Sequence, residues 1–192
     1  MVARLLAICV SVALTVPTLA APGGVDLLGT AASSGRALAN AVVWLEAGVG
    51  RAAEGGRAVL HQRSLKFAPQ VLVVRTGTVV DFPNDDRVFH NVFSFRDGKR
   101  FDLGIYPVGA TRQVVFSEPG VSRLFCNIHP NMAGYVVAVD TPWFASTGAE
   151  GRFRIDDVEP GTYTWRAWRA AGPTISGTIT VRPGSVLEVA WP

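Results

Sequence analysis

The sequence predicts an all-β protein made of one or two β-sandwiches. After the N-terminal segment, no stretch carries apolar residues at the helical period of about 3.6 over three turns. Short runs of β-branched and aromatic residues recur instead, each bounded by glycine, proline, asparagine or aspartate. The 20 glycines and 12 prolines favour a fold rich in turns. With 48% hydrophobic and 17% charged residues the chain can bury a core, so disorder is not expected.

Residues 1–20 have the pattern of a secretory signal peptide. Arg4 provides a positive start, Leu5 to Val16 is an uninterrupted apolar run, and small residues before Ala20 offer a cleavage site. The run is shorter than the roughly 20 residues that span a bilayer. We therefore expect export, to a periplasm, with no stable membrane anchor after the signal is removed.

The remaining expected strands fall into two sets separated by turn-rich segments. Residues 48–59 are rich in glycine and alanine and predict a loop or linker, and a second junction is expected near residues 140–142. The expected strands are 41–45, 71–74, 79–82, 88–95, 113–116, 121–126 and 135–139 in the first set, and 153–155, 163–168, 175–181 and 186–189 in the second.

The scarcest residue types of the chain are concentrated in one segment. Cys9 lies in the predicted signal, so the mature chain keeps a single cysteine and cannot form an intrachain disulfide. That cysteine, one of three histidines and the only mature methionine occur as Cys126, His129 and Met132. A second histidine, His90, lies on or beside an earlier expected strand. Folding of a sandwich could bring that strand end against the 126–132 loop.

The chemistry of these four side chains fits copper. One thiolate and two neutral imidazoles form a trigonal set, and a thioether adds a long axial contact. Sulfur ligands favour Cu(I), whereas imidazoles also suit Cu(II), so such a site cycles between the two states with little rearrangement. Zinc more often uses several cysteines or carboxylates and rarely takes methionine.

Taken singly, each of these residues also has a structural interpretation. Cys126 alone would be a small buried hydrophobe, Met132 a core filler and His90 a hydrogen-bonded structural histidine. Their joint spacing, together with the export signal, favours the metal site. The third histidine, His61, is expected to be structural or on the surface.

Other polar and aromatic pairs are expected to be structural. Asp85-Asp86 and Asp156-Asp157 lie beside turn residues and predict solvated turns. Trp165 and Trp168 have an odd spacing in one expected strand, so they should face opposite sides. No nucleophile and base form a recognisable motif, and no basic cluster with interleaved aromatics occurs. We therefore expect neither an enzyme nor a nucleic-acid-binding protein.

From about Ser64 to Asp140 the sequence resembles the cupredoxins, the small blue copper proteins. Within this family it is most similar to amicyanin and plastocyanin. The two-residue gap between His129 and Met132 is like that of amicyanin. The matching segments are Phe67-Ala68-Pro69, Val71 to Val74, Gly77, Val80 to Asn84, His90-Asn91-Val92, Pro119-Gly120, Cys126-x2-His129-x2-Met132 and Tyr135-Val136-Val137.

The resemblance implies a role for each site residue. His90, Cys126 and His129 would be the equatorial ligands of one type 1 copper, with Met132 the axial ligand. Asn91 would make a hydrogen bond that stiffens the thiolate loop. His129, with Pro130 beside it, would reach the surface and pass the electron.

The resemblance also implies an electron carrier, which the predicted signal would deliver to the periplasm. With all four copper positions filled, no open site is left for a substrate, which agrees with the expectation that the protein is not an enzyme. By analogy its partners would be a c-type cytochrome and a quinoprotein amine dehydrogenase, as in methylamine utilization. Two alternatives stay open at this point. One is a copper carrier or chaperone without fast redox cycling, and the other is a metal-free β-sandwich interaction module.

Residues 146–168 resemble a transthyretin-like module of the carboxypeptidase-regulatory type. A Gly turn precedes Phe153-Arg154-Ile155, and Pro160-Gly161-Thr162-Tyr163 starts the next expected strand. Val25 to Leu45 fits the beginning of such a module. The copper region is therefore either inserted into a second, smaller sandwich or followed by it. The expected segments are 1–20 for the signal, 21–59 for N-terminal strands and linker, 60–140 for the cupredoxin-like domain and 141–192 for the transthyretin-like strands.

Overall fold

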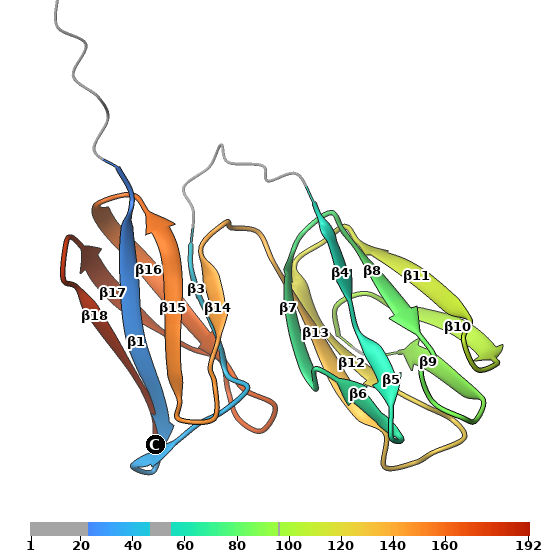
Figure 1. Ribbon diagram of the computed structural model, residues 1–192. Helices are drawn as coiled ribbons and strands as arrows, with labels where there is room; N and C mark the ends of the chain where they lie inside the picture. The colour runs from blue at the N-terminus through green and yellow to red at the C-terminus, as the bar shows by residue number, and fades with distance from the viewer. Residues whose placement is uncertain (1–22, 47–54, 96) are drawn as a thin grey trace, which may run out of the picture.

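The computed structural model describes residues 23–46, 55–95 and 97–192. The predicted signal, residues 1–20, and most of the predicted linker lie outside the described residues. The described parts contain 18 strands and no helix, which confirms the all-β prediction. In these parts there is no helix with the length and apolar character needed to cross a membrane. The strands form two sandwiches that stand side by side (Figure 1).

The first sandwich packs a five-stranded sheet against a three-stranded sheet. The larger sheet has the order β10-β9-β12-β13-β7 and the smaller one the order β11-β8-β4, with the hairpin β5–β6 beside them. The strands are β4 (Arg57–Val59), β5 (His61–Arg63), β6 (Lys66–Ala68), β7 (Val71–Arg75), β8 (Thr78–Pro83), β9 (His90–Ser94), β10 (Phe101–Tyr106), β11 (Thr111–Phe116), β12 (Gly120–Phe125) and β13 (Ala133–Val139).

The core of this sandwich comes from every second residue of its strands. Val80 and Phe82 of β8, Val92 of β9, Leu124 of β12 and Val136 of β13 are fully buried. Successive side chains of a strand point to opposite faces, so this alternation directs one face of each sheet into the core. Cys126 and Met132 belong to the same buried cluster.

The second sandwich is built from both ends of the chain. One of its sheets has the order β15-β1-β18, with β2 paired to β1, and the other has the order β14-β3-β16-β17. The strands are β1 (Val25–Ser33), β2 (Arg36–Ala37), β3 (Val42–Leu45), β14 (Phe144–Ser146), β15 (Arg152–Val158), β16 (Gly161–Trp168), β17 (Ile175–Val181) and β18 (Val186–Trp191).

Strand pairing decides between the two arrangements that the sequence leaves open. β1 pairs antiparallel with β15 and parallel with β18, and β3 pairs with β14 and β16. Strands β4 to β13 therefore form a unit inserted between β3 and β14. If the two sandwiches followed one another along the chain, β3 would instead pair with strands of the sandwich formed by β4 to β13.

The start of the inserted unit differs from the expected one. Residues 57–59, predicted within the linker, form β4 and pair in parallel with β8. Gly55 lies so close to Gly77 that a Cβ atom at Gly55 would come within 2.0 Å of the Gly77 backbone. A glycine in this segment thus permits close packing, whereas composition alone indicates a flexible linker. The partner strand of β4 is about 20 residues away, so local sequence carries little sign of the pairing.

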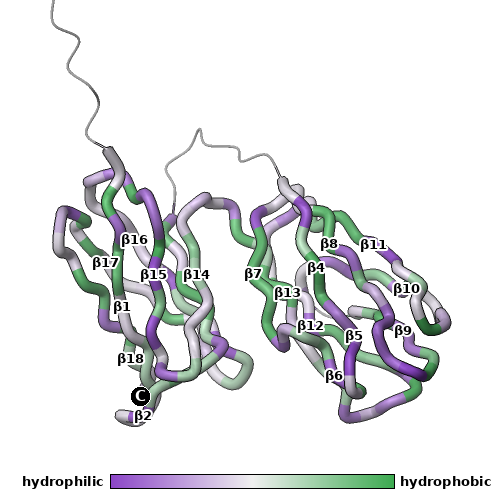
Figure 2. The backbone as a smooth tube through the Cα atoms, in the orientation of Figure 1, coloured by the Kyte–Doolittle hydropathy of each residue, from purple (hydrophilic) through white to green (hydrophobic). Residues whose placement is uncertain are grey.

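A third buried cluster, here called the junction cluster, joins the two sandwiches. Outward-facing residues of β7 and β13 pack there against β3, β14 and β16, and Figure 2 shows β7 as mostly hydrophobic. The Tyr135 and Trp168 rings meet with centroids 5.1 Å apart. Trp165 packs against the core of the second sandwich instead, so the two tryptophans face opposite sides as predicted. The buried members of the cluster are Val42, Val71, Val137, Val139 and Trp168.

Candidate metal centre

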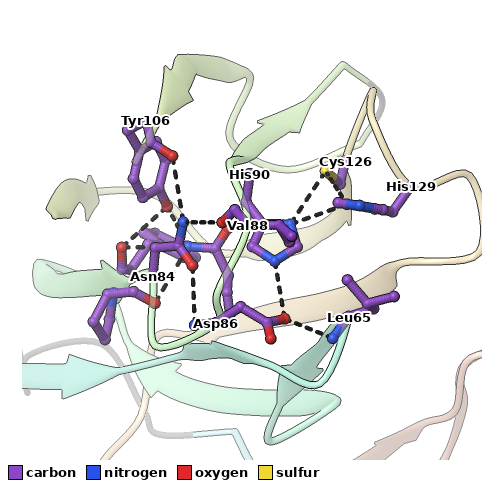
Figure 3. Close-up of polar contacts among 11 residues, drawn as sticks. Leu65, Asn84, Asp86, Val88, His90, Tyr106, Cys126 and His129 are labelled. Carbon is purple, nitrogen blue, oxygen red and sulfur yellow. Dashed lines mark hydrogen bonds and ion pairs between the residues drawn. The ribbon is translucent and has the colours of Figure 1, made fainter. Parts of the chain in front are cut away.

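Three of the predicted ligands meet at one end of the inserted sandwich. Cys126 Sγ lies 3.8 Å from His90 Nδ1 and 3.7 Å from His129 Nδ1, and the two Nδ1 atoms are 3.1 Å apart (Figure 3). Donor atoms bound to one ion at about 2.0–2.3 Å lie roughly 3–4 Å apart. The three atoms are therefore spaced for a single metal ion.

The pairing of β9 with β12 accounts for this convergence. Phe93 of β9 lies opposite Phe125 of β12 in an antiparallel pair. Residues after Phe125 therefore run back along the beginning of β9, where His90 is the first residue. His129 comes from the loop that connects β12 to β13, so the ladder positions two ligands and the loop supplies the third.

Met132 closes this loop from within the core. Its backbone N–H donates to His129 O at 2.9 Å, which makes the segment a tight turn. Its side chain is 1% exposed and belongs to the same buried cluster as Cys126. Pro130, between the two, is exposed. The thioether is thus placed on the protein side of the loop and Pro130 on the solvent side.

The chemistry of the donor set fits copper. It offers one thiol sulfur and two imidazole nitrogens, with a thioether nearby and no carboxylate in the group of three. Trigonal sets of two histidines and one cysteine with a distant methionine are typical of copper sites that transfer electrons. His90 is fully buried and Cys126 is 4% exposed, whereas His129 is partly exposed. His129 is therefore the ligand closest to solvent.

Asn91 ties the ligand loop to β9. Its Oδ1 accepts a hydrogen bond of 2.8 Å from the Asn127 N–H, and its Nδ2 donates to Asp102 Oδ1 at 3.0 Å. Asn91 is 1% exposed, so these contacts are shielded from water. The hydrogen bond that the resemblance implies for Asn91 is thus made to the residue directly after Cys126.

Asp86 is a site residue that no motif in the sequence marks. The expectation of a solvated turn fits the exposed Asp85, which pairs with His61 and Arg63. It is wrong for Asp86, whose Oδ2 lies 3.0 Å from His90 Nε2 and accepts the Leu65 N–H at 2.7 Å. The sequence alone does not distinguish the two adjacent aspartates, because the distant β5–β6 hairpin decides which of them is covered.

The contacts of Asp86 also favour its charged form. The Leu65 N–H first, and His90 after it, hold the pKa of the Asp86 carboxyl below its ordinary value, against the opposing effect of burial. The side chain of Asp86 is 16% exposed and that of His90 is fully buried. A carboxylate therefore faces the ring nitrogen of His90 that points away from Cys126.

Asn84 and Tyr106 organise the segment that leads to His90. Asn84 Nδ2 donates to Val88 O at 2.8 Å and to Tyr106 O at 3.3 Å, while its Oδ1 accepts the Asp86 N–H at 3.1 Å. The Tyr106 hydroxyl accepts from Gln62 Nε2 and donates to Phe82 O at 3.0 Å. Burial raises the pKa of the Tyr106 phenol. Asn84 ends one of the segments that carry the resemblance, whereas no motif marks Tyr106, because its role depends on its burial.

Exposed apolar side chains lie beside the site residues, either next to them in sequence or opposite them in the β9–β10 pair. Ile128 precedes His129 and is 41% exposed, and Phe89 precedes His90 and is 56% exposed. Ile105, 63% exposed, lies opposite Asn91 in the β9–β10 pair. The end of the sandwich that carries the ligands therefore presents apolar surface to solvent.

Comparison with known families and sequences gives limited matches. The family described as "Polysaccharide lyase family 4, domain II" matches residues 142–189, within the second sandwich. None of the curated proteins compared with the chain matches it. The transthyretin-like character of this sandwich is not addressed by these matches and stays a prediction.

Among solved structures, the chain is similar to copper proteins over about half of its length. A purple cupredoxin from Nitrosopumilus maritimus is 29% identical, with 43% of this chain and 99% of that chain covered and a TM-score of 0.40. Amicyanin from Paracoccus versutus is 24% identical, with coverages of 43% and 81% and a TM-score of 0.40. A copper-containing nitrite reductase from Thermus scotoductus is 23% identical, with coverages of 50% and 25% and a TM-score of 0.43. The chain thus spans a quarter of the reductase, and the case for copper rests on this chain's own donor atoms.

Proposed function

We propose that this protein is an electron carrier with one type 1 copper site formed by His90, Cys126, His129 and Met132. The observation that carries the proposal is the convergence of Cys126 Sγ with the Nδ1 atoms of both histidines, at 3.1–3.8 Å from one another. A copper ion held there would alternate between Cu(II) and Cu(I) and so carry one electron at a time.

The chain's own residues would keep the site rigid during this exchange. Asn91 anchors the backbone after Cys126, and Asp86 holds His90. Because the donors are fixed by a packed core, little rearrangement is needed when the charge of the centre changes. His129 is the partly exposed ligand and would be the point at which an electron enters or leaves.

The apolar surface around the ligands suits brief contacts with redox partners. Interfaces of transient electron-transfer complexes are small, at the low end of protein–protein contact areas. Ile128 and Phe89, both exposed, would form part of such a docking face. In our proposal the protein acts in a periplasm between partners such as a quinoprotein dehydrogenase and a c-type cytochrome, and catalyses no reaction of its own.

The test is to add Cu(II) to the purified mature protein and record its visible and EPR spectra. We expect an intense thiolate-to-copper absorption together with the narrow copper hyperfine splitting of a type 1 site. The matched control is Cys126→Ser, which removes the thiolate and should abolish the band. A wild-type protein that binds Cu(II) without this absorption would overturn the proposal.

A copper carrier is the competing function and makes a different prediction. A carrier must release its ion to a partner, so its ligands should be accessible. His90 is fully buried and Cys126 is 4% exposed, which favours a resident ion. We expect Cu(I) to exchange slowly with a competing chelator, and rapid exchange would favour the carrier.

A further inference from the structure

We propose that Asp86 is a positioning residue that fixes the ring of His90 and makes the site favour Cu(II) over Cu(I). This inference deepens the proposed function and rests on it for the copper part. The resemblance gives Asp86 no role, and the sequence pattern predicts only a solvated turn.

The contact between Asp86 and His90 decides which ring nitrogen carries the proton. Asp86 Oδ2 accepts the Leu65 N–H at 2.7 Å and is therefore an acceptor, so the His90 Nε2 that faces it at 3.0 Å is the donor. The Nδ1 of a neutral ring then has a free lone pair. That Nδ1 is the atom directed at Cys126 Sγ and at His129 Nδ1. Asp86 therefore selects the form of His90 that can bind a metal.

Asp86 is held in place at its carboxylate and at its backbone. The Leu65 N–H, at the tip of the β5–β6 hairpin, donates to Asp86 Oδ2, and the Asp86 N–H donates to Asn84 Oδ1. Ser64 and Leu65 have φ values of 54° and 58°. Neither residue is glycine or asparagine, so the hairpin keeps a costly turn at the place where it reaches Asp86.

The negative charge of Asp86 has a direct effect on the proposed metal preference. A carboxylate on the far nitrogen of a ligating imidazole increases the basicity of the ring and stabilises the more highly charged ion. Asp85 carries the same charge one residue earlier but pairs with His61 and Arg63. The two aspartates therefore form a matched pair of equal charge, in which Asp86 alone contacts His90.

The experiment compares Asp86→Asn with Asp85→Asn in the full mature protein. Loss of such an outer partner of a metal ligand lowers metal affinity by about 10–100-fold. For Asp86→Asn we expect at least a ten-fold fall in Cu(II) affinity relative to Cu(I), which equals a rise of about 59 mV in a one-electron reduction potential. For Asp85→Asn we expect less than a three-fold change. Equal shifts in the two variants would overturn the proposal, because they would reflect charge alone.

A second measurement does not depend on copper or on any variant. Imidazole ¹⁵N spectra of the metal-free wild-type protein report which nitrogen of His90 is protonated. We expect the proton on Nε2, and a proton found on Nδ1 alone would overturn the positioning role even if Asp86→Asn failed to fold. If the wild-type protein gave no type 1 spectrum, the electron-carrier function would fail, whereas these spectra would still decide the role of Asp86.

Discussion

At the residue scale, single polar side chains hold the candidate metal centre together. Asn91 joins the strand that starts with His90 to the backbone that follows Cys126. Asp86 does the same between His90 and the β5–β6 hairpin. Away from water, the loss of such a contact costs more free energy through the polar group left unpaired than the hydrogen bond itself contributes.

Replacement of Asn91 by alanine should therefore destabilise the metal-free protein. The Asn127 N–H and Asp102 Oδ1 would each lose a partner, and an unpaired group of this kind costs about 1–3 kcal/mol. Urea unfolding measures the change in the free energy of unfolding. Asn131→Ala, at an exposed position of the same loop, should change it by less than about 0.5 kcal/mol. Similar losses in both variants would contradict the role of Asn91.

Tyr106 predicts how the protein responds to alkaline pH. Burial raises the pKa of its phenol above the value of about 10 expected in the unfolded chain. Because the folded state holds this proton more tightly, the contribution to stability is complete below about pH 10 and is lost as the pH rises further. Ultraviolet tyrosinate absorbance should show one tyrosine that ionises only on unfolding. That signal should be missing from Tyr106→Phe, and ionisation of Tyr106 in the folded protein near pH 10 would contradict the prediction.

At the element scale, the β5–β6 hairpin combines a structural cost with a role at the site. Its two central residues, Ser64 and Leu65, both lie in the left-handed region. Such a turn matches the twist of a hairpin, and Asn-Gly is the sequence best suited to it. The chain uses neither residue, and the Leu65 side chain is 48% exposed, so packing does not explain its presence.

The double variant Ser64→Asn/Leu65→Gly should therefore be more stable than the wild type. Relief of the left-handed strain contributes roughly 0.5–2 kcal/mol, which thermal unfolding measures as an increase in Tm. The Leu65 N–H is kept, so the His90 proton should stay on Nε2. Lys66→Gly, placed in β6 next to the turn, should lower Tm instead. A lower Tm for the double variant would show that the turn is not strained.

At the scale of the whole molecule, the second sandwich supports the sheet that contains the metal loop. β13 begins directly after Met132, and its outward residues join the junction cluster with Trp168. The two sandwiches therefore share buried apolar surface and are expected to unfold together. The support acts on the strand that leaves the ligand loop.

Trp168→Ala tests this coupling. Removal of a buried tryptophan costs about 3–5 kcal/mol, and here the loss falls on the contact between the sandwiches. We expect one calorimetric transition for the wild type and two for Trp168→Ala. Leu28→Ala, at a position of β1 that is 51% exposed, should keep one transition. A single transition in Trp168→Ala, merely shifted to lower temperature, would show that the junction does not couple the two units.

Part of the fold and of the candidate site could be predicted from the sequence, because these features depend on local pattern or on composition. Alternating apolar residues and frequent turn residues predict the all-β class, which the strands confirm. The short spacing of Cys126, His129 and Met132 predicts a metal-binding loop, and the structure brings Cys126 and His129 together with His90. Such features are visible in one stretch of chain, so no knowledge of distant partners is needed.

The sequence by itself thus determined the fold class and the residues of the candidate ligand loop, whose donor types suit copper. Only the tertiary structure decided that strands β4 to β13 are inserted in the second sandwich, that residues 57–59 belong to the inserted unit, and that Asp86 rather than Asp85 contacts His90. Each of these depends on a pairing between segments far apart in the chain: β3 with β16, β4 with β8, and Leu65 with Asp86. Strand pairing and burial are properties of the assembled sheets, and local residue preference specifies them only weakly.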